Sequence, residues 1–278
     1  MKSLIALALL LCITTAFEIR GPRNTQRERL GSMVKKVVLS SRIANGQTAA
    51  ANEFPYQAGL LLNNGEHFYF CGGSLISNEW VLTAAHCTST AVKVFIYLGS
   101  ITHLYPIVPM EVDKCDIKVH YAFDMKTGRN DIALIKIPFV IYSDAIQPVS
   151  LPKCAASYPT YIGETVVASG WGCTSDRSKL YSPVLQFANF RVVTNEVCTD
   201  EYSSSLIDNE QICTATVNRI GICTGDSGGP LMLASSKLQI GIVSTGSSKG
   251  CETGAPALHT RVTSYLDWIR ANTGLGFK

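Results

Sequence analysis

A glycine-rich stretch at residues 221–230, with the sequence Gly-Ile-Cys-Thr-Gly-Asp-Ser-Gly-Gly-Pro, constrains this chain more than any other segment. It places one acid and one serine among four glycines. Glycines let a backbone turn sharply and let a ligand approach closely. A serine on such a turn, Ser227, can present its hydroxyl beside neighbouring N–H groups, which is the geometry that acyl transfer requires. The alternative is a surface loop with an incidental serine, and a base and an acid elsewhere in the chain argue against it.

Two other motifs supply that base and that acid. His86 stands in Thr-Ala-Ala-His-Cys at residues 83–87, and Asp131 heads the apolar run of Asn-Asp-Ile-Ala-Leu at residues 130–134. His, Asp, Ser is one of the known chain orders of the catalytic triad. The three motifs resemble the trypsin/chymotrypsin family of serine endopeptidases, and within it the invertebrate chymotrypsin-like and brachyurin-like enzymes. The resemblance covers about residues 43–270.

Residues 1–16 have the pattern of a secretory signal peptide. Lys2 is followed by ten apolar residues at 4–13 and by small residues up to Ala16, which is the order of regions in such a peptide. A membrane anchor is the alternative, but a helix needs about 20 apolar residues to cross the hydrocarbon core. We therefore expect a secreted, extracellular protein without a membrane-spanning segment.

Residues 17–42 are polar and basic and form the predicted activation peptide. Residues 1–42 carry a net charge of +6. The whole chain carries +3, so residues 43–278 carry 3 − 6 = −3. The mature protein is therefore expected to be mildly acidic. A nucleic-acid partner loses its support, because such partners select a basic surface.

The junction between Arg42 and Ile43 resembles the activation site of the family. Cleavage after Arg42 by a trypsin-like protease would free the α-amino group of Ile43. In the family this ammonium pairs with the acid that precedes the catalytic serine, here Asp226, and a buried carboxylate is costly unless it is paired. A second basic-to-apolar junction at residues 36–38 is the alternative. We favour Arg42 because Phe-Pro-Tyr-Gln at residues 54–57 follows it at the family's spacing.

Residues 43–278 contain many short runs rich in Val, Ile and aromatic residues, separated by Gly, Pro, Asn and Ser. This pattern predicts an all-β sandwich or barrel. The resemblance implies a serine protease domain of two packed antiparallel six-stranded β-barrels, with the break between them near residues 146–160. Only the end of the chain has a helical period, which predicts a short C-terminal helix. Its apolar positions are Val262, Tyr265, Leu266 and Ile269.

Ten cysteines are present, and Cys12 would leave with the signal peptide. Nine cysteines in a secreted protein predict disulfides and one leftover thiol. The resemblance implies three pairs by matching motifs, which are Cys71 with Cys87, Cys198 with Cys213, and Cys223 with Cys251. Spacing does not choose a pair among Cys115, Cys154 and Cys173.

A metal or cofactor is not expected. Zinc is the alternative use of cysteines, but no C-x-x-C or H-x₃-H spacing occurs. Ser100 follows the Leu-Gly turn after which the family's calcium loop carries acids, so we expect no calcium site. His67, His103 and His120 lie in predicted loops, and we expect these side chains to be solvated.

The resemblance assigns a role to each residue of the triad motifs. Ser227 would be the nucleophile, His86 the general base and Asp131 the group that orients the imidazole. The backbone N–H groups of Gly225 and Ser227 would bind the oxyanion. The segment 244–246 would pair with the substrate backbone as an added strand.

The resemblance also implies a primary specificity pocket with Gly221 at its base. Tryptic enzymes carry an aspartate there, and a glycine would leave a buried substrate cation without a partner. The other pocket positions are Ile222, Ser244, Gly246 and Ala257. This composition predicts an apolar pocket for Phe, Tyr, Leu or Met. Thr245, which loosens one wall, and His259, at the back of the pocket, keep other preferences open, including one for an acidic residue.

Two other functions stay open. A secreted, non-catalytic homologue that acts as a binding module would usually lack a triad residue, and a cascade protease with tryptic specificity would carry an acid at the position of Gly221. The expected partners are protein or peptide substrates, the activating protease and protein protease inhibitors. We expect a monomer. The motifs do not distinguish a digestive, venom or immune role.

Overall fold

The computed structural model describes residues 43–276 apart from residues 103–106, 179, 203–206 and 216–218. The predicted signal and activation peptides therefore lie outside the described residues, as does His103. No helix among the described residues is long and apolar enough to cross a membrane.

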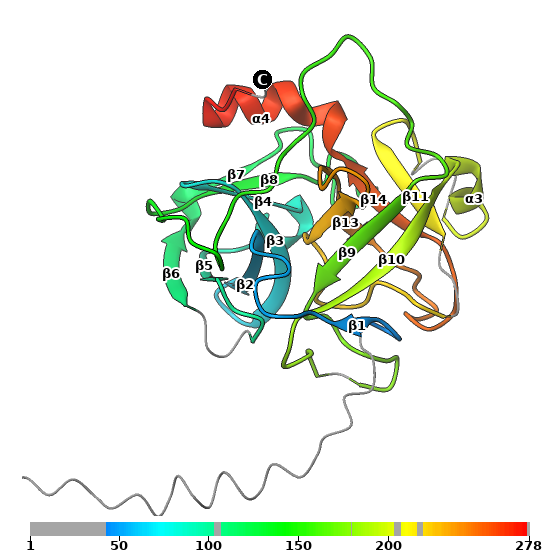
Figure 1. Ribbon diagram of the computed structural model, residues 1–278, viewed down its shortest axis with the longest axis horizontal. Helices are drawn as coiled ribbons and strands as arrows, with labels where there is room; N and C mark the ends of the chain where they lie inside the picture. Colours follow the sequence, from blue (N-terminus) through cyan, green and yellow to red (C-terminus); the bar gives the residue numbers. More distant parts are fainter. Residues whose placement is uncertain (1–42, 103–106, 179, 203–206, 216–218, 277–278) are drawn as a thin grey trace, which may run out of the picture. The chain divides into compact units, whose positions relative to one another are not determined.

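The first of two sheets uses the N-terminal half of the described chain (Figure 1). Its strands pair antiparallel in the order β6-β5-β2-β3-β4-β8-β7. The 3-10 helix η1 (Lys114–Asp116) is all that separates β6 from β7 in the chain, so both ends of this order belong to one bent segment. The sheet thus closes into a six-stranded barrel. Its strands are β2 (Gln57–Asn63), β3 (Phe68–Ser77), β4 (Trp80–Thr83), β5 (Lys93–Leu98), β6 (Val108–Asp113), β7 (Ile117–Val119) and β8 (Ala133–Lys136).

The second sheet closes in the same way. Its order is β10-β11-β14-β13-β12-β9, and β9 pairs with β10 again. The short strand β1 (Gln47–Thr48) adds to β10 from outside this ring. The six strands are β9 (Thr165–Gly170), β10 (Gln186–Val193), β11 (Gln211–Ala215), β12 (Pro230–Leu233), β13 (Gln239–Thr245) and β14 (Ala257–Arg261). The predicted all-β fold of two six-stranded barrels is confirmed.

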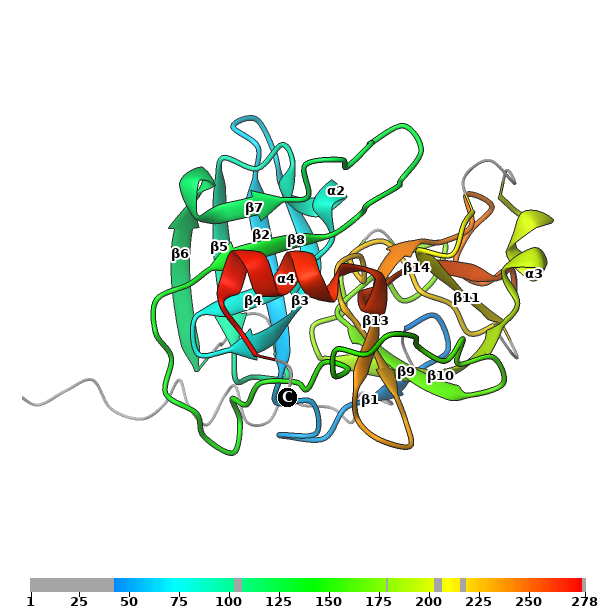
Figure 2. The ribbon, with the colours of Figure 1, turned by 90° about the horizontal axis from the view of Figure 1, so that it is seen from above.

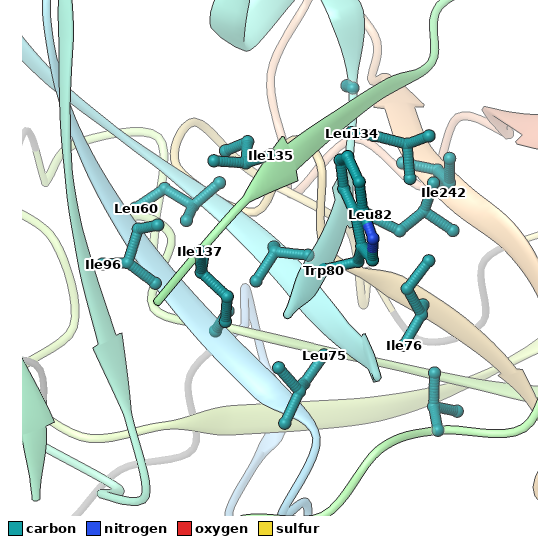
Figure 3. Close-up of a cluster of buried hydrophobic side chains, with 14 of the residues drawn as sticks. Leu60, Leu75, Ile76, Trp80, Leu82, Ile96, Leu134, Ile135, Ile137 and Ile242 are labelled. Carbon is teal, nitrogen blue, oxygen red and sulfur yellow. The ribbon is translucent and has the colours of Figure 1, made fainter. Parts of the chain in front are cut away.

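Alternating apolar residues build the core of the first barrel. In β5 the side chains of Val94, Ile96 and Leu98 are buried while their neighbours are partly exposed, as the two-residue period of a strand requires. Figure 3 shows this core, in which Leu134 of β8 and Ile242 of β13 lie together. Each such side chain contributes about 1.5–3 kcal/mol by leaving water. Because Ile242 comes from the second barrel, the same core also holds the two barrels together.

Glycines allow the two barrels to meet backbone to backbone. A Cβ on Gly72 of β3 would lie 2.8 Å from Cα of Gly229, which directly precedes β12. A Cβ on Gly228 would lie 2.2 Å from Thr83 Oγ1, and Thr83 ends β4. Real Cβ atoms do not tolerate such distances, so larger residues would push the barrels apart. The Gly-Asp-Ser-Gly-Gly turn at residues 225–229 is therefore packed against the end of β4.

The chain ends in the 3-10 helix η3 (Val262–Tyr265) and the helix α4 (Leu266–Thr273). Gly274 stops α4 in the left-handed conformation, with φ of 73°. The four residues of the predicted helical period are all buried, and they join the core of the first barrel. Figures 1 and 2 both show α4 lying along the first barrel, although it follows the last strand of the second. The predicted C-terminal helix is confirmed and adds a second link between the barrels.

Three disulfides are present, and they are the pairs that the resemblance implies: Cys71–Cys87, Cys198–Cys213 and Cys223–Cys251. The expectation of one leftover thiol is wrong, because three described cysteines are free. Cys115 on η1 and Cys154 in the connection between the barrels are exposed, whereas Cys173 is buried. An odd number of cysteines implies only that at least one of them is not in a disulfide within the chain.

The expectation for one histidine is also wrong. His67 is exposed as expected, but His120 is buried. Its ring stacks on Tyr121 at 4.6 Å and packs against Tyr265 and Trp268 of the C-terminal segment. Burial lowers the pKa of His120. These partners lie so far along the chain that the local sequence of His120 does not reveal them.

Candidate active site

The register of two strands brings the acid and the base together. His86 lies in the short helix α2 (Ala85–Thr88), directly after β4, and Asp131 directly precedes β8. β4 and β8 are antiparallel neighbours in which Thr83 pairs with Ala133. The end of one strand therefore lies beside the start of the other, and the two motifs meet although 45 residues separate them.

His86 and Asp131 form a doubly bonded pair. Asp131 Oδ1 accepts from the backbone N–H of His86 at 2.8 Å, and Oδ2 lies 2.7 Å from His86 Nδ1. The side chain of Asp131 is 2% exposed and that of His86 is 28% exposed. A carboxylate at this depth needs donors in order to remain ionised. With both oxygens engaged, Asp131 orients the imidazole so that Nε2 is left for another partner.

The second barrel holds the same aspartate. Ser244 at the end of β13 donates from Oγ to Asp131 Oδ2 at 2.7 Å, and Thr260 of β14 donates from Oγ1 to the Asp131 carbonyl at 2.8 Å. The sequence led us to assign Ser244 to the substrate backbone, and this use of its side chain was missed. A hydroxyl next to the expected substrate strand is too weak a signal, because the contact spans 113 residues.

The pKa of His86 results from opposing effects. Burial lowers it, but the hydrogen bond and the charge of Asp131 raise it by more, so that it lies above its ordinary value of 6.5. A carboxylate that raises the pKa of an imidazole makes the ring accept a proton more readily. His86 therefore has the properties of a general base.

The backbone around Ser227 has a shape that glycine allows. Gly225 has φ of 101° and Gly228 has φ of 80°, both in the left-handed region that other residues rarely adopt. Ser227 accepts from the N–H of Gly72 in the first barrel at 2.7 Å, and Gly228 donates to Val243 in the second at 2.7 Å. The turn is thus fixed by both barrels, and Ser227 lies partly exposed between them.

Two features of this turn concern a reacting carbonyl. The N–H groups of Gly225 and Ser227 donate to no group among the described residues, so they are available to an acceptor from outside. No hydrogen bond joins Ser227 to His86 within the described part of the chain, and His86 Nε2 lies 3.6 Å from Cys87 Sγ. In ligand-free sites such catalytic hydrogen bonds are often long and tighten only when substrate binds.

Asp226, next to the serine, is a buried carboxylate. Its side chain is 1% exposed, and its oxygens accept from the N–H of Gly172 at 2.8 Å and of Cys223 at 2.9 Å. A Cβ on Gly170 or Gly172 would lie within 2.5 Å of the carboxyl group, so two glycines make room for it. Burial raises the pKa of Asp226 to about 6, although both N–H bonds act in the opposite direction. A cation placed next to this buried carboxylate would stabilise its charged form.

The segment after the predicted cleavage point is embedded in the fold. Ile43 is 1% exposed and Ala44 is also buried. Ala44 accepts from the N–H of Gly221 at 3.3 Å, and Asn45 donates from its side chain to the carbonyl of Arg219 at 2.9 Å. The chain that begins at Ile43 is therefore bound to the loop that leads to Ser227.

Comparisons with known proteins agree with this geometry. The family model described as Trypsin matches residues 43–269. The chain belongs to the trypsin family of serine endopeptidases. It is 40% identical to a collagenase of Hypoderma lineatum over the full length of both, and 38% identical to brachyurin of Leptuca pugilator over 84% of this chain and 99% of that protein. A solved structure named HL collagenase superimposes with a TM-score of 0.78 at 42% identity, covering 84% of this chain and 99% of that one.

The predicted pocket positions of this trypsin-family chain lie close together. Gly221 and Ile222 are buried, and a Cβ on Gly246 would lie 3.5 Å from the Ile222 side chain. Ala257 shares a buried apolar cluster with Ile222. The surfaces that these residues offer are apolar, apart from backbone groups. Thr245, whose effect the sequence left open, is exposed at the end of β13.

His259 is poorly suited to receive an acidic side chain. It is 0% exposed, its Nε2 lies 2.8 Å from Thr214 Oγ1, and Nδ1 has no partner among the described residues. Burial lowers the pKa of His259 to about 3. The ring is therefore neutral at any pH at which a substrate carboxylate is ionised, and it offers no charge to pair with one.

The residues that could approach a metal are otherwise engaged. Cys71, His86 and Cys87 place their ligand atoms within 4.8 Å of one another. Both sulfurs are consumed in one disulfide, and Nδ1 of His86 faces Asp131. Metal ligands must be thiolates or imidazoles with a free lone pair, so this group does not fit a metal.

Two hollows of the surface lie away from the predicted catalytic residues. Residues that line the first include Asn52, Phe54 and Ile107, and residues that line the second include Tyr56, Pro148 and Met232. Neither contains His86, Asp131 or Ser227.

Proposed function

We propose that the protein is a secreted endopeptidase, made as a zymogen, that hydrolyses peptide bonds through Ser227, His86 and Asp131. The observation that carries this proposal is the Asp131–His86 pair, with bonds of 2.7 and 2.8 Å, at the contact between the two barrels where the glycine turn carries Ser227. The family supplies the reaction class, and the buried acid beside an imidazole of raised pKa supplies the base that a serine hydroxyl needs.

The proposed reaction runs in two halves. Ser227 Oγ attacks the carbonyl carbon of the scissile bond and its proton passes to His86 Nε2, while Asp131 stabilises the imidazolium without taking the proton. The carbonyl oxygen becomes an oxyanion between the N–H groups of Gly225 and Ser227. His86 then gives the proton to the leaving amine, and a water repeats both steps on the acyl-enzyme. One oxyanion donor is generally worth about 3 kcal/mol of transition-state stabilisation.

The zymogen proposal depends on Asp226 and Ile43. The buried Asp226 carboxyl has two N–H donors, and its pKa of about 6 indicates that its charge is still costly. Cleavage after Arg42 by a trypsin-like protease would create an ammonium on Ile43, whose side chain is already buried. Such a cation would pair with Asp226 and hold the adjacent oxyanion turn in its active shape.

The proposed specificity is for Phe, Tyr, Leu or Met before the scissile bond. Gly221, Ile222, Gly246 and Ala257 offer no charge to a substrate side chain, and the neutral His259 adds none. A methylene more or less in such a pocket is worth only ~1–3 kcal/mol, so selectivity among these residues would be loose. Two of the relatives carry the names collagenase and brachyurin, so collagen belongs among the protein substrates to be tried.

The test is active-site labelling together with peptide hydrolysis. The chain activated at Arg42 should react with a fluorophosphonate and cleave a Phe or Leu chromogenic peptide. The Ser227→Ala variant should do neither, with a residual rate several orders of magnitude lower and an unchanged melting temperature. A non-catalytic binding module would remain unlabelled in the unmutated form, and a tryptic enzyme would prefer Arg or Lys. More than a tenth of the activity in Ser227→Ala would refute the assignment of the nucleophile.

A further inference from the structure

A backbone carbonyl lies against Gly221, the glycine predicted at the base of the specificity pocket. A Cβ built on Gly221 would lie 2.1 Å from the carbonyl oxygen of Cys251. This oxygen therefore takes the space that a side chain at position 221 would fill. Tryptic enzymes carry an acidic side chain at the position of Gly221. In this protein the nearest polar atom to that space is a neutral acceptor, the carbonyl oxygen of Cys251 from a different segment of the chain.

This acceptor has no protein partner. Among the residues that the structure describes, no N–H or hydroxyl donates to the carbonyl of Cys251. Ile222 and Ala257, two predicted pocket residues that share one buried cluster, bring no polar side-chain group. Cys251 is partly exposed, so a substrate donor can reach this carbonyl. A bound substrate side chain that lacks a donor would displace water and leave the carbonyl unpaired, which is unfavourable.

The peptide that carries this carbonyl is held from outside the pocket. Asp176 Oδ1 accepts from the N–H of Cys251 at 2.5 Å, and Oδ2 accepts from the N–H of Glu252 at 3.3 Å. Glu252 returns a bond from Oε2 to the N–H of Asp176 at 2.8 Å. Gly250 has φ of 129°, and a Cβ there would lie 2.6 Å from the Asp176 carboxylate. The disulfide to Cys223 ties the same residue to the serine loop.

We infer that the Cys251 carbonyl, held in place by Asp176, is a specificity determinant that selects substrate residues ending in a neutral hydrogen-bond donor, tyrosine above all. This inference rests on the proposed function and sharpens its specificity. A tyrosine hydroxyl reaching the pocket base donates to the carbonyl, whereas phenylalanine leaves it unpaired. A lysine or arginine finds an acceptor but no counter-charge. Asp176 and Glu252 face the outer hollow, where Arg177 and Arg219 stand beside them.

The experiment compares substrates that differ only in the residue before the scissile bond. The activated enzyme is given tyrosine, p-methylphenylalanine, p-aminophenylalanine and leucine in otherwise identical chromogenic peptides. p-Methylphenylalanine matches tyrosine in size but has no donor. Tyrosine and p-aminophenylalanine should exceed it in kcat/KM by about tenfold, which corresponds to about 1.4 kcal/mol. An equal or higher kcat/KM for the methyl compound overturns the inference.

The Asp176→Ala variant tests the positioning role. Asp176 is exposed, so its loss leaves the core intact. The ratio of kcat/KM for tyrosine over p-methylphenylalanine should fall at least threefold, while cleavage after leucine stays within twofold. Asp144→Ala, at an exposed aspartate in the connection between the barrels, is the matched control and should keep the ratio of the unmutated enzyme. An unchanged ratio in Asp176→Ala overturns the role of Asp176.

Failure of the proposed function gives a different result. In that case the activated chain neither reacts with the fluorophosphonate nor cleaves any of the four peptides. Cleavage of all four without a preference for a donor leaves the triad proposal intact and refutes only the role of the Cys251 carbonyl.

Discussion

Replacing Asp131 by asparagine tests the triad proposal with almost no change in volume. The carboxylate receives three hydrogen bonds: from the His86 backbone at 2.8 Å, at His86 Nδ1 at 2.7 Å and from Ser244 at 2.7 Å. Asparagine has one oxygen and one NH₂ group. If the oxygen takes the position of Oδ2, the NH₂ group faces the backbone N–H of His86, donor against donor. If it takes the position of Oδ1, that bond is kept and the NH₂ group faces His86 Nδ1.

The second orientation satisfies every group, and it disables the base. The amide donates to Nδ1, the Ser244 hydroxyl rotates to become an acceptor, and the proton of the neutral imidazole moves to Nε2. Nε2 then has no lone pair for the Ser227 proton, and the imidazolium formed in the reaction loses its counter-charge. A wrong tautomer of this kind lowers kcat by about 10⁴-fold, which is about 5 kcal/mol of transition-state stabilisation.

The assay is kcat/KM on a chromogenic peptide as a function of pH, with Asp144→Asn as a control that changes an exposed aspartate. The Asp131→Asn enzyme should lose about four orders of magnitude of activity near neutral pH. Asp131 is the source of the bond and the charge that raise the pKa of His86, so the acid limb of the residual activity should also move to lower pH. A loss of less than tenfold, or an acid limb that does not move, would refute the assigned role of Asp131.

Three further predictions follow from the same geometry. Because the pKa of His86 is raised and the base must be neutral, activity should be present above that pKa and decline as pH falls through it, with a midpoint above 6.5 in kcat/KM. Arg42→Gln should block activation by trypsin, whereas the activated unmutated enzyme should begin at Ile43 on N-terminal sequencing. That enzyme should lose activity at alkaline pH, because the α-amino group deprotonates and leaves Asp226 unpaired. Full activity without cleavage would contradict this prediction. Leu134→Ala, at a position that is 0% exposed, should lower the free energy of unfolding by ~2–5 kcal/mol in urea denaturation, whereas Ile141→Ala, at 81% exposure, should change it by less than about 0.5 kcal/mol.

The motifs predicted the fold and identified the residues of the proposed triad because each motif is local. His86 follows a strand, Asp131 precedes one, and Ser227 stands among glycines that specify a turn, so a short window contains the information. The four apolar residues at helical spacing within 262–269 predicted the C-terminal helix for the same reason. Its seat on the first barrel could not be predicted, because packing depends on which apolar face is left open after both barrels close.

The sequence was least informative about contacts between distant segments. His120 is buried under Tyr265 and Trp268, which lie about 145 residues further along the chain. The Ser244 hydroxyl reaches Asp131 across the contact between the barrels. The Cys251 carbonyl is a backbone group, and no residue identity reveals that its oxygen lies against Gly221. Each of these depends on three-dimensional register, which a single sequence without the fold does not contain.

The glycines at the contact between the barrels explain why this site can be both rigid and exposed. Side chains at an interface adapt by changing rotamers, and a nucleophile that depended on them would move with them. Here Ser227 is held through its own carbonyl by the N–H of Gly72. Gly228 leaves no room for a Cβ against Thr83 Oγ1, and Gly72 leaves none against the backbone of Gly229. Thr83 directly precedes the segment that carries His86 and donates to the carbonyl of Gly72 at 2.8 Å. The distance from the turn to His86 is therefore set by close-packed glycines and one short side chain, which have little freedom to relax. Enlarging Gly228 to alanine would force both a strained φ and a collision with Thr83 Oγ1, so it should cost activity well before it costs the fold of either barrel.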